Sequence, residues 1–337
     1  MSKSTCIVDL VMNISSSQAT PSMDGDLVRL VQLDESALEP YLEMLGDPEG
    51  RRLTATKAVF SRPQIIEWLS SRATTAGRSD WAIIEQSTGE FAGEIVLNEF
   101  DEKKNSMNLR IALRGSDWFG RGLGGEAIQL VLEHVFNNTK LSKITLEVLT
   151  ENARAIGAYE KSGFQPGREF SEGKHRFLRM SCDRYDFIRA LAERKMAEHI
   201  DLENWQFGFD SAKRRAGLCN YTNKTITISR YLVDIHTIDE SMQVVLHEVA
   251  HAMCGKRDGH SKKWLATAKS IGYRAERFTG TEIAQETATW VGTCKNGHTH
   301  YRYRQPSRPL ACGLCGRGFS RSNLIVWQHR DELELED

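Results

Sequence analysis

The sequence HEVAH at residues 247–251 constrains this 337-residue chain more than any other feature. Residues four apart share one face of an α-helix, so His247 and His251 can point at one metal ion with Glu248 beside it. His260 can supply a third ligand and leave the fourth position of a zinc ion open for water. Zinc lowers the pKa of a bound water, and Glu248 is the expected general base. The pattern therefore favours a zinc metalloprotease.

The alternative is an ordinary amphipathic helix whose two histidines lie on a solvated surface. The residues around the motif are largely apolar, which leaves no obvious polar face for such a pair. These residues are Met242, Val244, Val245, Leu246, Val249, Ala250 and Met253. A buried helix with paired histidines favours a metal site.

Several further segments give the second half of the chain a family resemblance. They are residues 212–217 (AKRRAG), 226–229, 259–264 (GHSKKW) and 271–273 (IGY). With the HEVAH motif, they resemble the SprT-like (Spartan-type) metalloprotease domain, and we expect that domain over residues 183–290. The family uses three histidines and a glutamate in the roles given above. Ser261 stands where the family usually has glycine, a change that we expect to alter a loop without removing a ligand. Tyr221 and Tyr273 are possible oxyanion donors.

A second metal motif follows, with ligand candidates at Cys294, His298, Cys312 and Cys315. Two short ligand pairs, each on a tight turn with glycine, are typical of a closed structural zinc site. We expect a zinc ribbon over residues 291–328, as in many SprT-like domains. His300 competes with His298 as the fourth ligand, and the other alternative is a disulfide or no metal.

The first half mixes amphipathic helices with strands, which predicts an α/β or α+β domain. The expected helices are 35–45, 64–73, 125–137 and 154–162, and the expected strands are 81–85, 93–100, 107–113, 143–149 and 177–181. A further helix over 184–198 is expected to join the two halves. Length also favours two domains, because 337 residues exceed what one core usually organises.

A glycine-rich stretch at residues 118–127 (WFGRGLGGEA) joins a strand to a helix. Such a loop can direct backbone N–H groups at a pyrophosphate, although its spacing alone also fits a dinucleotide site or a plain turn. Together with residues 148–164, it resembles the GNAT acetyltransferase family, in its ribosomal-protein N-terminal acetyltransferase form. We expect that domain over residues 25–182.

The GNAT resemblance implies that acetyl-CoA is the cofactor. The residues implied to bind it are Ile111, Leu113, Phe119, Gly120, Arg121, Gly122, Gly124, Gly125, Asn152 and Tyr159. The resemblance assigns the loop backbone to the pyrophosphate and Tyr159 to protonation of the departing thiolate. Many members carry Gln or Arg where this chain has Phe119.

The resemblance does not fix the general base of the acetyltransferase. Glu94 and Asn98 share one face of their strand by period-2 alternation, with Glu99 on the other. A carboxylate facing the acceptor could deprotonate an ammonium directly or through water, which makes Glu94 a catalytic candidate. The alternative is that Glu94 is a solvated residue of an edge strand.

The second half of the chain is basic. Residues 183–330 hold 23 Lys and Arg against 15 Asp and Glu, a difference of +8. Around the ribbon, basic residues interleave with aromatic ones, a composition suited to phosphate contacts and base stacking. They are Lys295, Arg302, Arg304, Arg308, Arg317 and Arg321, with Tyr301, Tyr303, Phe319 and Trp327. A solvated charged face is the alternative, whereas the SprT-like resemblance implies single-stranded or junction DNA as a partner and DNA-bound proteins as substrates.

The ends of the chain are expected to lie outside both cores. Residues 1–24 are serine-rich and predict a disordered leader rather than a signal peptide, and residues 329–337 form an acidic tail. The remaining cysteines show no pairing pattern and no run is apolar enough to span a membrane, so we expect a cytoplasmic protein with no membrane partner.

The sequence thus predicts an α+β chain. A GNAT mixed sheet with flanking helices precedes a mainly helical zincin-type domain and a small β zinc ribbon. The leading hypothesis is a bifunctional enzyme with catalytic and structural Zn²⁺ ions and acetyl-CoA. In one alternative the GNAT domain only recruits a protein target. In another, the whole chain is a nucleic-acid-binding module without proteolysis.

Overall fold

The computed structural model describes residues 20–274 and 288–330 of the chain. The chain divides into two compact units, Met1–Leu191 and Ala192–Asp337. Most of the expected leader, part of the stretch before the ribbon and residues 331–337 of the expected tail lie outside the described residues. Among the described residues, no helix combines the length and apolarity needed to cross a membrane. The whole is an α+β protein.

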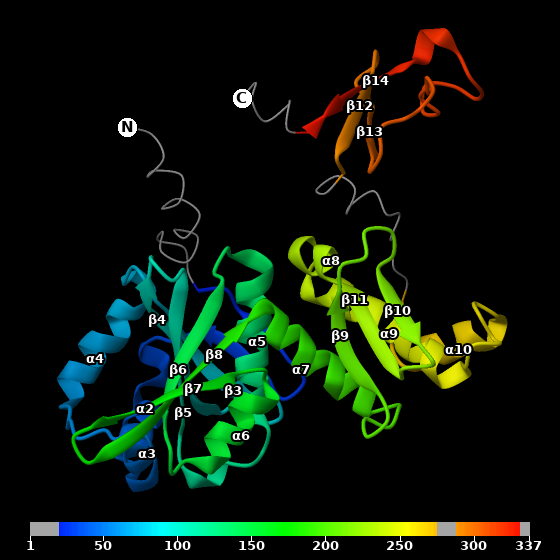
Figure 1. Cartoon of the computed structure of the whole chain (residues 1–337). Helices are drawn as coiled ribbons and strands as arrows, with labels where there is room; N and C mark the ends of the chain where they lie inside the picture. The colour runs from blue at the N-terminus through cyan, green and yellow to red at the C-terminus, as the bar shows by residue number, and fades with distance from the viewer. Residues whose placement is uncertain (1–19, 275–287, 331–337) are drawn as a thin grey trace. The chain divides into compact units, whose positions relative to one another are not determined.

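An eight-stranded mixed sheet forms the centre of the first unit (Figure 1). Its strand order is β1-β2-β3-β4-β5-β6-β8-β7. The strands are β1 (Met23–Asp24), β2 (Val28–Gln32), β3 (Ser79–Glu85), β4 (Phe91–Asp101), β5 (Ser106–Leu113), β6 (Lys143–Leu149), β7 (Gln165–Glu172) and β8 (His175–Asp183). All neighbouring strands are antiparallel except β5 and β6.

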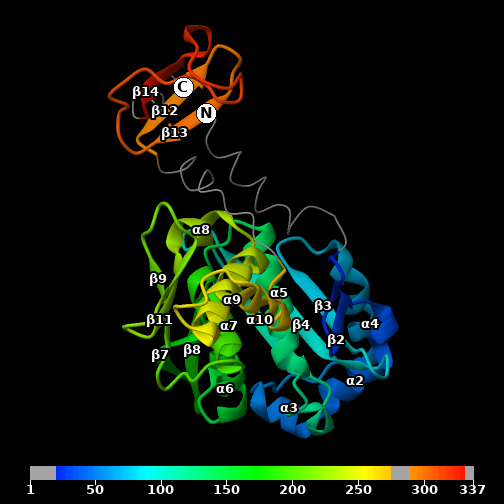
Figure 2. The same ribbon diagram turned by 90° about the vertical axis from the view of Figure 1, so that its right-hand side faces the viewer.

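Helices cover both faces of this sheet. They are η1 (Glu35–Ala37), α2 (Leu38–Gly46), α3 (Pro48–Leu53), α4 (Arg62–Ser71), η2 (Arg72–Thr74), η3 (Ser116–Trp118), α5 (Leu123–Asn138) and α6 (Ala153–Lys161). Figure 2 shows α2 and α4 on one side of β3 and β4, with α5 on the other. Tyr41, Met44, Ile65 and Leu69 of the first layer pack on Ala82 and Phe91 of the sheet. The apolar face of α5 buries Ile128, Val131 and Val135.

The parallel pair β5 and β6 is hydrogen-bonded over only part of its length. Pairing runs from Ser106 to Asn108 on β5, although the strand continues to Leu113. Likewise, β6 continues beyond Thr145 to Leu149. The two strands therefore separate at the end where the glycine-rich loop follows β5.

The first strand corrects the expected leader. Met23 and Asp24 pair with Leu30 and Arg29, so the folded unit begins before residue 25. The Trp81 indole donates a 2.9 Å hydrogen bond to the Pro21 carbonyl and holds this segment on the sheet. The serine-rich composition gave no sign of this anchor, because its partner lies 60 residues away.

Helix α7 (Arg184–Ala197) contains the boundary between the two units and confirms the expected connecting helix. The second unit then begins with a three-stranded sheet of order β10-β11-β9. Its strands are β9 (Gln206–Asp210), β10 (Gly217–Asn220) and β11 (Thr225–Ser229), and its helices are α8 (Arg230–Ile235), α9 (Ile238–Cys254) and α10 (Lys262–Ser270). Strand β10 lies at the edge of this sheet and contacts α9.

Helix α9 carries the HEVAH motif, and local sequence explains its limits. A capping box of Thr237 and Glu240 starts it, because each side chain satisfies a backbone N–H of the other residue. Gly255, with φ of 85°, ends it. Val244, Val245 and Val249 are buried, so tertiary packing holds the helix in place.

The ribbon is a separate antiparallel sheet of order β13-β12-β14, with β12 (Trp290–Cys294), β13 (Thr299–Arg302), η4 (Arg321–Asn323) and β14 (Ile325–His329). Gly292 lies against Ile325 and Trp327 of β14, so closely that an added Cβ would stand 2.5–2.8 Å from their side chains. Arg330 still pairs with Thr289 through its backbone N–H. The ribbon thus extends slightly beyond the expected limits of 291 and 328.

Candidate metal centres and acetyl-CoA site

The structure brings His247, His251 and His260 together. Their Nε2 atoms lie 3.0–3.2 Å from one another, two on α9 and the third in the loop before α10. A tetrahedral zinc ion with Zn–N bonds of about 2.0–2.1 Å holds its nitrogen ligands about 3.3–3.4 Å apart. Burial, followed by repulsion from the other two histidines, lowers the pKa of His251 to about 4 and keeps its imidazole neutral. The three side chains fit a zinc ion with an open fourth position.

Trp264 forms a wall of this histidine cluster. Its indole is buried and packs against all three imidazoles, with ring centroids 4.7 Å from His247 and His260 and 5.1 Å from His251. Ser261, at the position where the family has glycine, caps α10 by accepting a hydrogen bond from the Trp264 N–H. The substitution therefore helps to start the helix that carries Trp264.

Glu248 is buried beside the cluster, on the side of edge strand β10. A Cβ added to Gly217 would lie 2.8 Å from Glu248 Cγ and Oε1, so the strand passes close to this carboxylate. The Tyr221 hydroxyl donates to the His251 carbonyl at 3.1 Å, and the Tyr273 ring meets His247 edge-on. Tyr221 is thus engaged in holding α9, while Tyr273 stays an oxyanion candidate.

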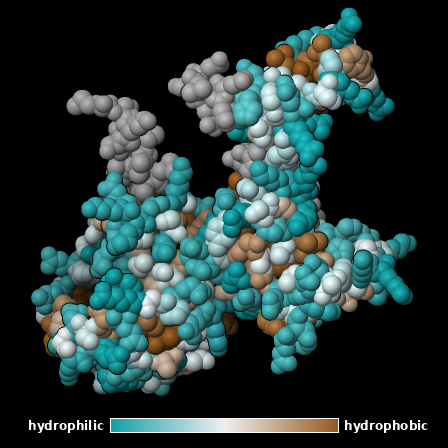
Figure 3. All heavy atoms as spheres, in the orientation of Figure 1, coloured by the Kyte–Doolittle hydropathy of each residue, from teal (hydrophilic) through white to brown (hydrophobic). Residues whose placement is uncertain are grey.

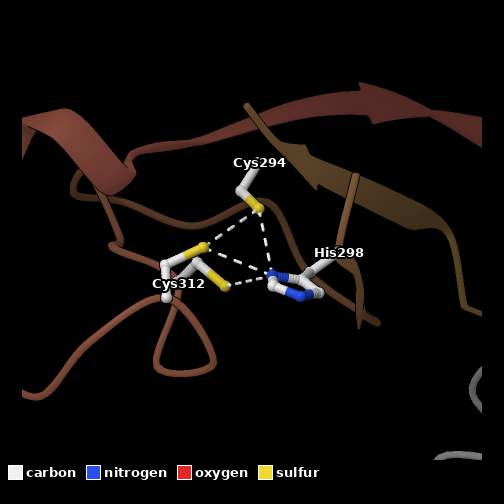
Figure 4. Close-up of side chains that lie close together, drawn as sticks. Cys294, His298 and Cys312 are labelled. Atoms are coloured by element: carbon white, nitrogen blue, oxygen red, sulfur yellow. Dashed lines mark hydrogen bonds between the residues drawn. The ribbon is translucent and has the colours of Figure 1, made fainter. Parts of the chain in front are cut away.

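The ribbon gathers a second cluster of ligand atoms from two turns (Figure 4). His298 Nδ1 lies 3.3 Å from Cys315 Sγ and 3.6 Å from the sulfur atoms of Cys294 and Cys312. Cys294 and Cys315 are 3.6 Å apart. Zinc with Zn–S bonds of about 2.3 Å separates its ligands by about 3.6–3.8 Å, so the four fit a closed tetrahedral site.

His300 lies next to the ribbon cluster rather than within it. Its Nε2 is 3.2 Å from Cys312 Sγ, while the four-residue group contains His298. A histidine N–H directed at a thiolate stabilises its negative charge and orients it. The geometry therefore favours His298 as ligand and gives His300 a supporting hydrogen bond.

In the first unit, the glycine-rich loop leads directly into α5. Gly120 and Gly122 have φ of 72° and 85°, which side chains disfavour, and Gly122 is the last residue before the helix. The first N–H groups of a helix have no acceptor within it and suit a phosphate. A Cβ on Gly124 would lie 3.6 Å from Ile111 and 3.8 Å from Leu113, so the structure brings the loop and the end of β5 together. Gly125 follows in the same turn.

Two loop side chains have partners that the sequence did not reveal. Arg121 forms an ion pair with the buried Glu85 of β3. Its side chain is therefore engaged, and its backbone is the part left for the predicted binding of acetyl-CoA. Phe119 lies under the Arg154 guanidinium of α6, 3.8 Å from the ring centroid. Arg154 therefore places a positive charge beside the loop, next to Phe119.

Helix α6 follows β6 and carries the other predicted cofactor residues. Asn152 caps the helix, and its side chain accepts a hydrogen bond from the Ala155 N–H at 3.2 Å. Tyr159 is buried with its ring edge-on to Phe164. Burial raises the pKa of Tyr159 to about 12 and keeps its hydroxyl protonated. A protonated phenol is the form that a general acid requires.

Glu94 lies in the centre of the sheet, since β4 pairs with β3 and β5. The alternative of a solvated edge residue is therefore wrong. Tyr41 of α2 donates to Glu94 Oε2 at 3.1 Å. Burial raises the pKa of Glu94 to about 7, against the opposing effect of the Tyr41 hydrogen bond. The strand alternation holds as far as Asn98, where the pairing register shifts next to Glu99.

Glu126, in the first turn of α5, was not predicted as a separate feature. Its carboxylate accepts hydrogen bonds from the backbone N–H groups of Asp26, Leu27 and Val28 at 2.7–2.9 Å. Gly25 permits this turn to approach, because a Cβ there would lie 2.6 Å from the carboxylate. The turn at residues 25–28 thus holds the start of α5, the helix that follows the glycine-rich loop.

Two family models match the chain, one over most of the first unit and one mainly over the second. The acetyltransferase (GNAT) domain model matches residues 28–165, and the SprT-like family model matches residues 187–286. The chain therefore contains a GNAT acetyltransferase domain followed by a SprT-like domain.

Individual relatives resemble the first unit. The N-acetyltransferase 9-like protein of Caenorhabditis briggsae is 22% identical over 146 residues, covering 40% of this chain and 73% of that protein. The uncharacterized N-acetyltransferase p20 of Bacillus licheniformis is 23% identical over 157 residues, covering 45% of this chain and 86% of that protein.

Two solved structures are also similar. One is a spermidine N-acetyltransferase from Vibrio cholerae in complex with CoA and spermine, with 18% identity, TM-score 0.44, and 49% of this chain and 99% of that chain covered. The other is a GCN5-related N-acetyltransferase from Brucella melitensis, with 16% identity, TM-score 0.45, and 57% and 90% covered.

Proposed function

We propose that this chain is a bifunctional enzyme, with a zinc-dependent endopeptidase in the second unit and an acetyl-CoA-dependent N-acetyltransferase in the first. The observation that carries the endopeptidase is the triangle of three Nε2 atoms with Glu248 buried on the same helix. A closed structural site occupies all four zinc positions with protein ligands, whereas this cluster offers three among the residues that the structure describes. Matches to the GNAT and SprT-like families support both halves.

The candidate site residues of the second unit have separate roles in peptide hydrolysis. His247, His251 and His260 would hold the zinc ion, which supplies Lewis acidity and lowers the pKa of water. Glu248 accepts the proton of the attacking water and returns it to the departing amine. Edge strand β10 passes beside Glu248 and has β11 as its single strand neighbour among the described residues, so an extended peptide substrate can add to its other edge as a strand.

We further propose that the protein substrates are associated with DNA. Residues 183–330 have an excess of eight positive charges, which favours binding to a phosphate backbone. Binding of enzyme and substrate to one strand raises their local concentration, which suits a protease without a defined specificity pocket. A cytoplasmic location is part of this proposal, because thiolate zinc ligands such as those of the ribbon stay reduced there.

The endopeptidase is tested by incubating the zinc-loaded chain with a DNA-binding protein, with and without single-stranded DNA, and following fragments on a gel. Glu248→Gln should lose about 10²–10⁴-fold in cleavage rate while retaining zinc, because it removes the general base and no ligand. Glu198→Gln, which alters an exposed carboxylate of the same unit, is the matched control and should cleave normally. A chelator should abolish cleavage. Equal cleavage by Glu248→Gln would refute the assignment.

In the first unit, we propose transfer of acetyl from acetyl-CoA to a protein or small-molecule amine. Glu94 takes a proton from the acceptor ammonium, the amine forms a bond to the acetyl carbon, and the C–S bond breaks. Tyr159 then protonates the thiolate, and the new amide nitrogen releases its second proton, which restores the Tyr159 phenol. The pKa of Glu94 near 7 and the protonated state of Tyr159 support these roles. Release of CoA thiol in the presence of candidate amines measures the reaction.

The second candidate function is a nucleic-acid-binding or recruitment protein in which only one domain is catalytic. It is favoured by the basic ribbon with its closed cluster of ligands, because that arrangement is structural. A zinc-loaded wild-type chain that binds DNA but does not cleave any protein would select this function.

A further inference from the structure

An exposed arginine lies beside the candidate base Glu94 on the same face of the first sheet. Glu94 of β4 is paired with Ala112 of β5, and Val96 is paired with Arg110. Alternate residues of a strand share a face, so Arg110 projects from the same face as Glu94. The two are diagonal neighbours across the strand pair, a separation of about 7–8 Å. A base and a cation therefore border one surface.

Arg110 lies at the point where β5 and β6 separate. The last residue of β5 that pairs with β6 is Asn108, two positions before Arg110. Ile111 and Leu113, which are predicted to bind acetyl-CoA, follow on the same strand. Strand β5 has β4 on one side and the separated part of β6 on the other. Arg110 is therefore near both Glu94 and the predicted place of the cofactor.

The Arg110 side chain is available to a ligand. It is exposed, and it makes no hydrogen bond or ion pair with the residues that the structure describes. Two other arginines act on Glu94 from the same side, and both are engaged. Arg78 makes two hydrogen bonds of 2.6–2.7 Å to the buried Asp80, and the buried Arg72 stacks on an indole ring. Arg110 is the cation of this group that can take a new partner.

The carboxylates of this face leave Glu94 to receive an ammonium group. Asp80 is neutralised by the arginine pair described above. Beyond the point of strand separation, Glu147 of β6 forms an ion pair with Arg179 of β8. Tyr41 occupies Oε2 of Glu94 with a neutral hydrogen bond, which leaves Oε1 available to the acceptor.

Glu94 and Arg110 have opposite charges but do not form an ion pair with each other. Burial raises the pKa of Glu94 to about 7, and the Tyr41 hydrogen bond and the charge of Arg110 oppose this rise. The two groups are thus within electrostatic range of each other. A ligand with an ammonium for Glu94 and a carboxylate for Arg110 would complement both charges.

The neighbouring part of this face is also polar. Asn108 donates a 3.1 Å hydrogen bond from Nδ2 to Asn98 Oδ1, and the pair keeps a further amide donor and acceptor for a ligand. The side of the first unit seen in Figure 3 is mainly hydrophilic, with small, separate hydrophobic patches. These features favour a polar acceptor.

We propose that Arg110 selects acceptors that carry a carboxylate close to their primary amine. Such an acceptor is either a free α-amino acid or a polypeptide with an acidic first residue. The inference rests on the proposed acetyltransferase and names its acceptor class. The amine lies at Glu94 while the guanidinium of Arg110 binds the carboxylate, in the two-pronged geometry that suits these groups. Arg110 determines specificity and takes no part in the proton transfers.

The test measures release of CoA thiol by the full zinc-loaded chain with two matched pairs of acceptors. Alanine and alaninamide differ in the carboxylate of a free amino acid. The tetrapeptide amides DAAA and NAAA differ in the carboxylate of the first side chain. The wild type should prefer the carboxylate in at least one pair, and the pair that responds identifies the source.

Arg110→Ala should reduce that preference in kcat/KM about 10–100-fold, the effect of one charge-assisted hydrogen bond. The loss should come mainly from a higher KM for the carboxylate acceptor, with little change for its uncharged partner. Arg110→Lys should retain part of the preference, because it keeps the charge without the planar fork. Arg176→Ala removes another exposed arginine of the same sheet and should leave the preference unchanged.

Each contrary result has a distinct meaning. A wild type without preference in either pair, together with an inactive Glu94→Gln, would overturn the acceptor class and leave the acetyltransferase intact. An equal loss on both members of each pair in Arg110→Ala would overturn the specificity role. No thiol release with these acceptors or with simple alkylamines would overturn both proposals. Circular dichroism of Arg110→Ala should match the wild type, and Arg110→Lys tests the same role if it does not.

Discussion

The two catalytic candidates of this chain are built in opposite ways. In the SprT-like domain, side chains of one helix and one loop converge on a point, and the histidine Nε2 atoms define it. In the GNAT domain, backbone makes the site, through separated strands and glycines that lead into α5. Substitutions that remove a ligand atom should destroy the site made of side chains. Substitutions that add a side chain at a glycine should destroy the site made of backbone.

The largest expected effect comes from adding bulk to the backbone-built site. Gly124→Trp should abolish acetyl-CoA binding in isothermal titration calorimetry, because a side chain there meets Ile111 and Leu113 and fills the space beside the loop. Cleavage by the second unit should be unchanged. Gly46→Trp is the control, since nothing lies within 4 Å of a Cβ at that position. Normal acetyl-CoA affinity in Gly124→Trp would show that the loop does not form the site.

The second-largest effect concerns Glu94, and it tests whether the backbone-built site also depends on one side chain. Glu94→Gln should lower the acetylation rate about 10²–10⁴-fold. The wild-type rate should rise as pH increases through about 7, because Glu94 accepts a proton only after it has lost its own. The rate of Glu94→Gln should not show this rise. Glu99→Gln, on the same strand at the register shift, should keep the wild-type profile.

The smallest effect concerns the support of the backbone. Glu126→Gln weakens three charge-assisted hydrogen bonds to the turn at residues 25–28 and should cost about 1–2 kcal/mol of unfolding free energy. The KM for acetyl-CoA should rise a few-fold with little change in kcat, because the start of α5 is less firmly held. Glu160→Gln, on the exposed face of α6, should change neither quantity. A fall in kcat alone would contradict this positioning role.

Most elements of the GNAT domain were predictable because each has a local hydrophobic period. Strand β6 (Lys143–Leu149) matches its prediction at both ends, and α5 differs from its prediction by one or two residues. Strand β1 was not predictable, because the contacts that hold it in place come from Trp81 and from pairing with β2. Local patterns therefore identify the elements, while contacts far apart in sequence decide where the fold begins.

The sites divide in the same way. The histidine cluster could be predicted because His247, Glu248 and His251 lie close together in the HEVAH motif of one helix. The partners of Glu94 and Phe119 could not, since Tyr41 and Arg154 reach them from other elements. The hydrogen bond from the Tyr303 hydroxyl to the Lys213 carbonyl joins residues 90 positions apart in the sequence, so it could not be predicted either. A sequence motif identifies site residues that lie close together in the chain. Contacts with side chains from distant elements leave no comparable pattern in the sequence.

Helix α7 has a practical consequence for cutting this protein into parts. The boundary between the two units falls inside the helix, with Phe187 and Ile188 buried before it and Ala192 and Met196 buried after it. A fragment that ends at Leu191 would expose a frayed helical end and lose the capping of its last turn. Fragments for separate study should therefore retain the whole of α7 in each half, as overlapping pieces of the chain.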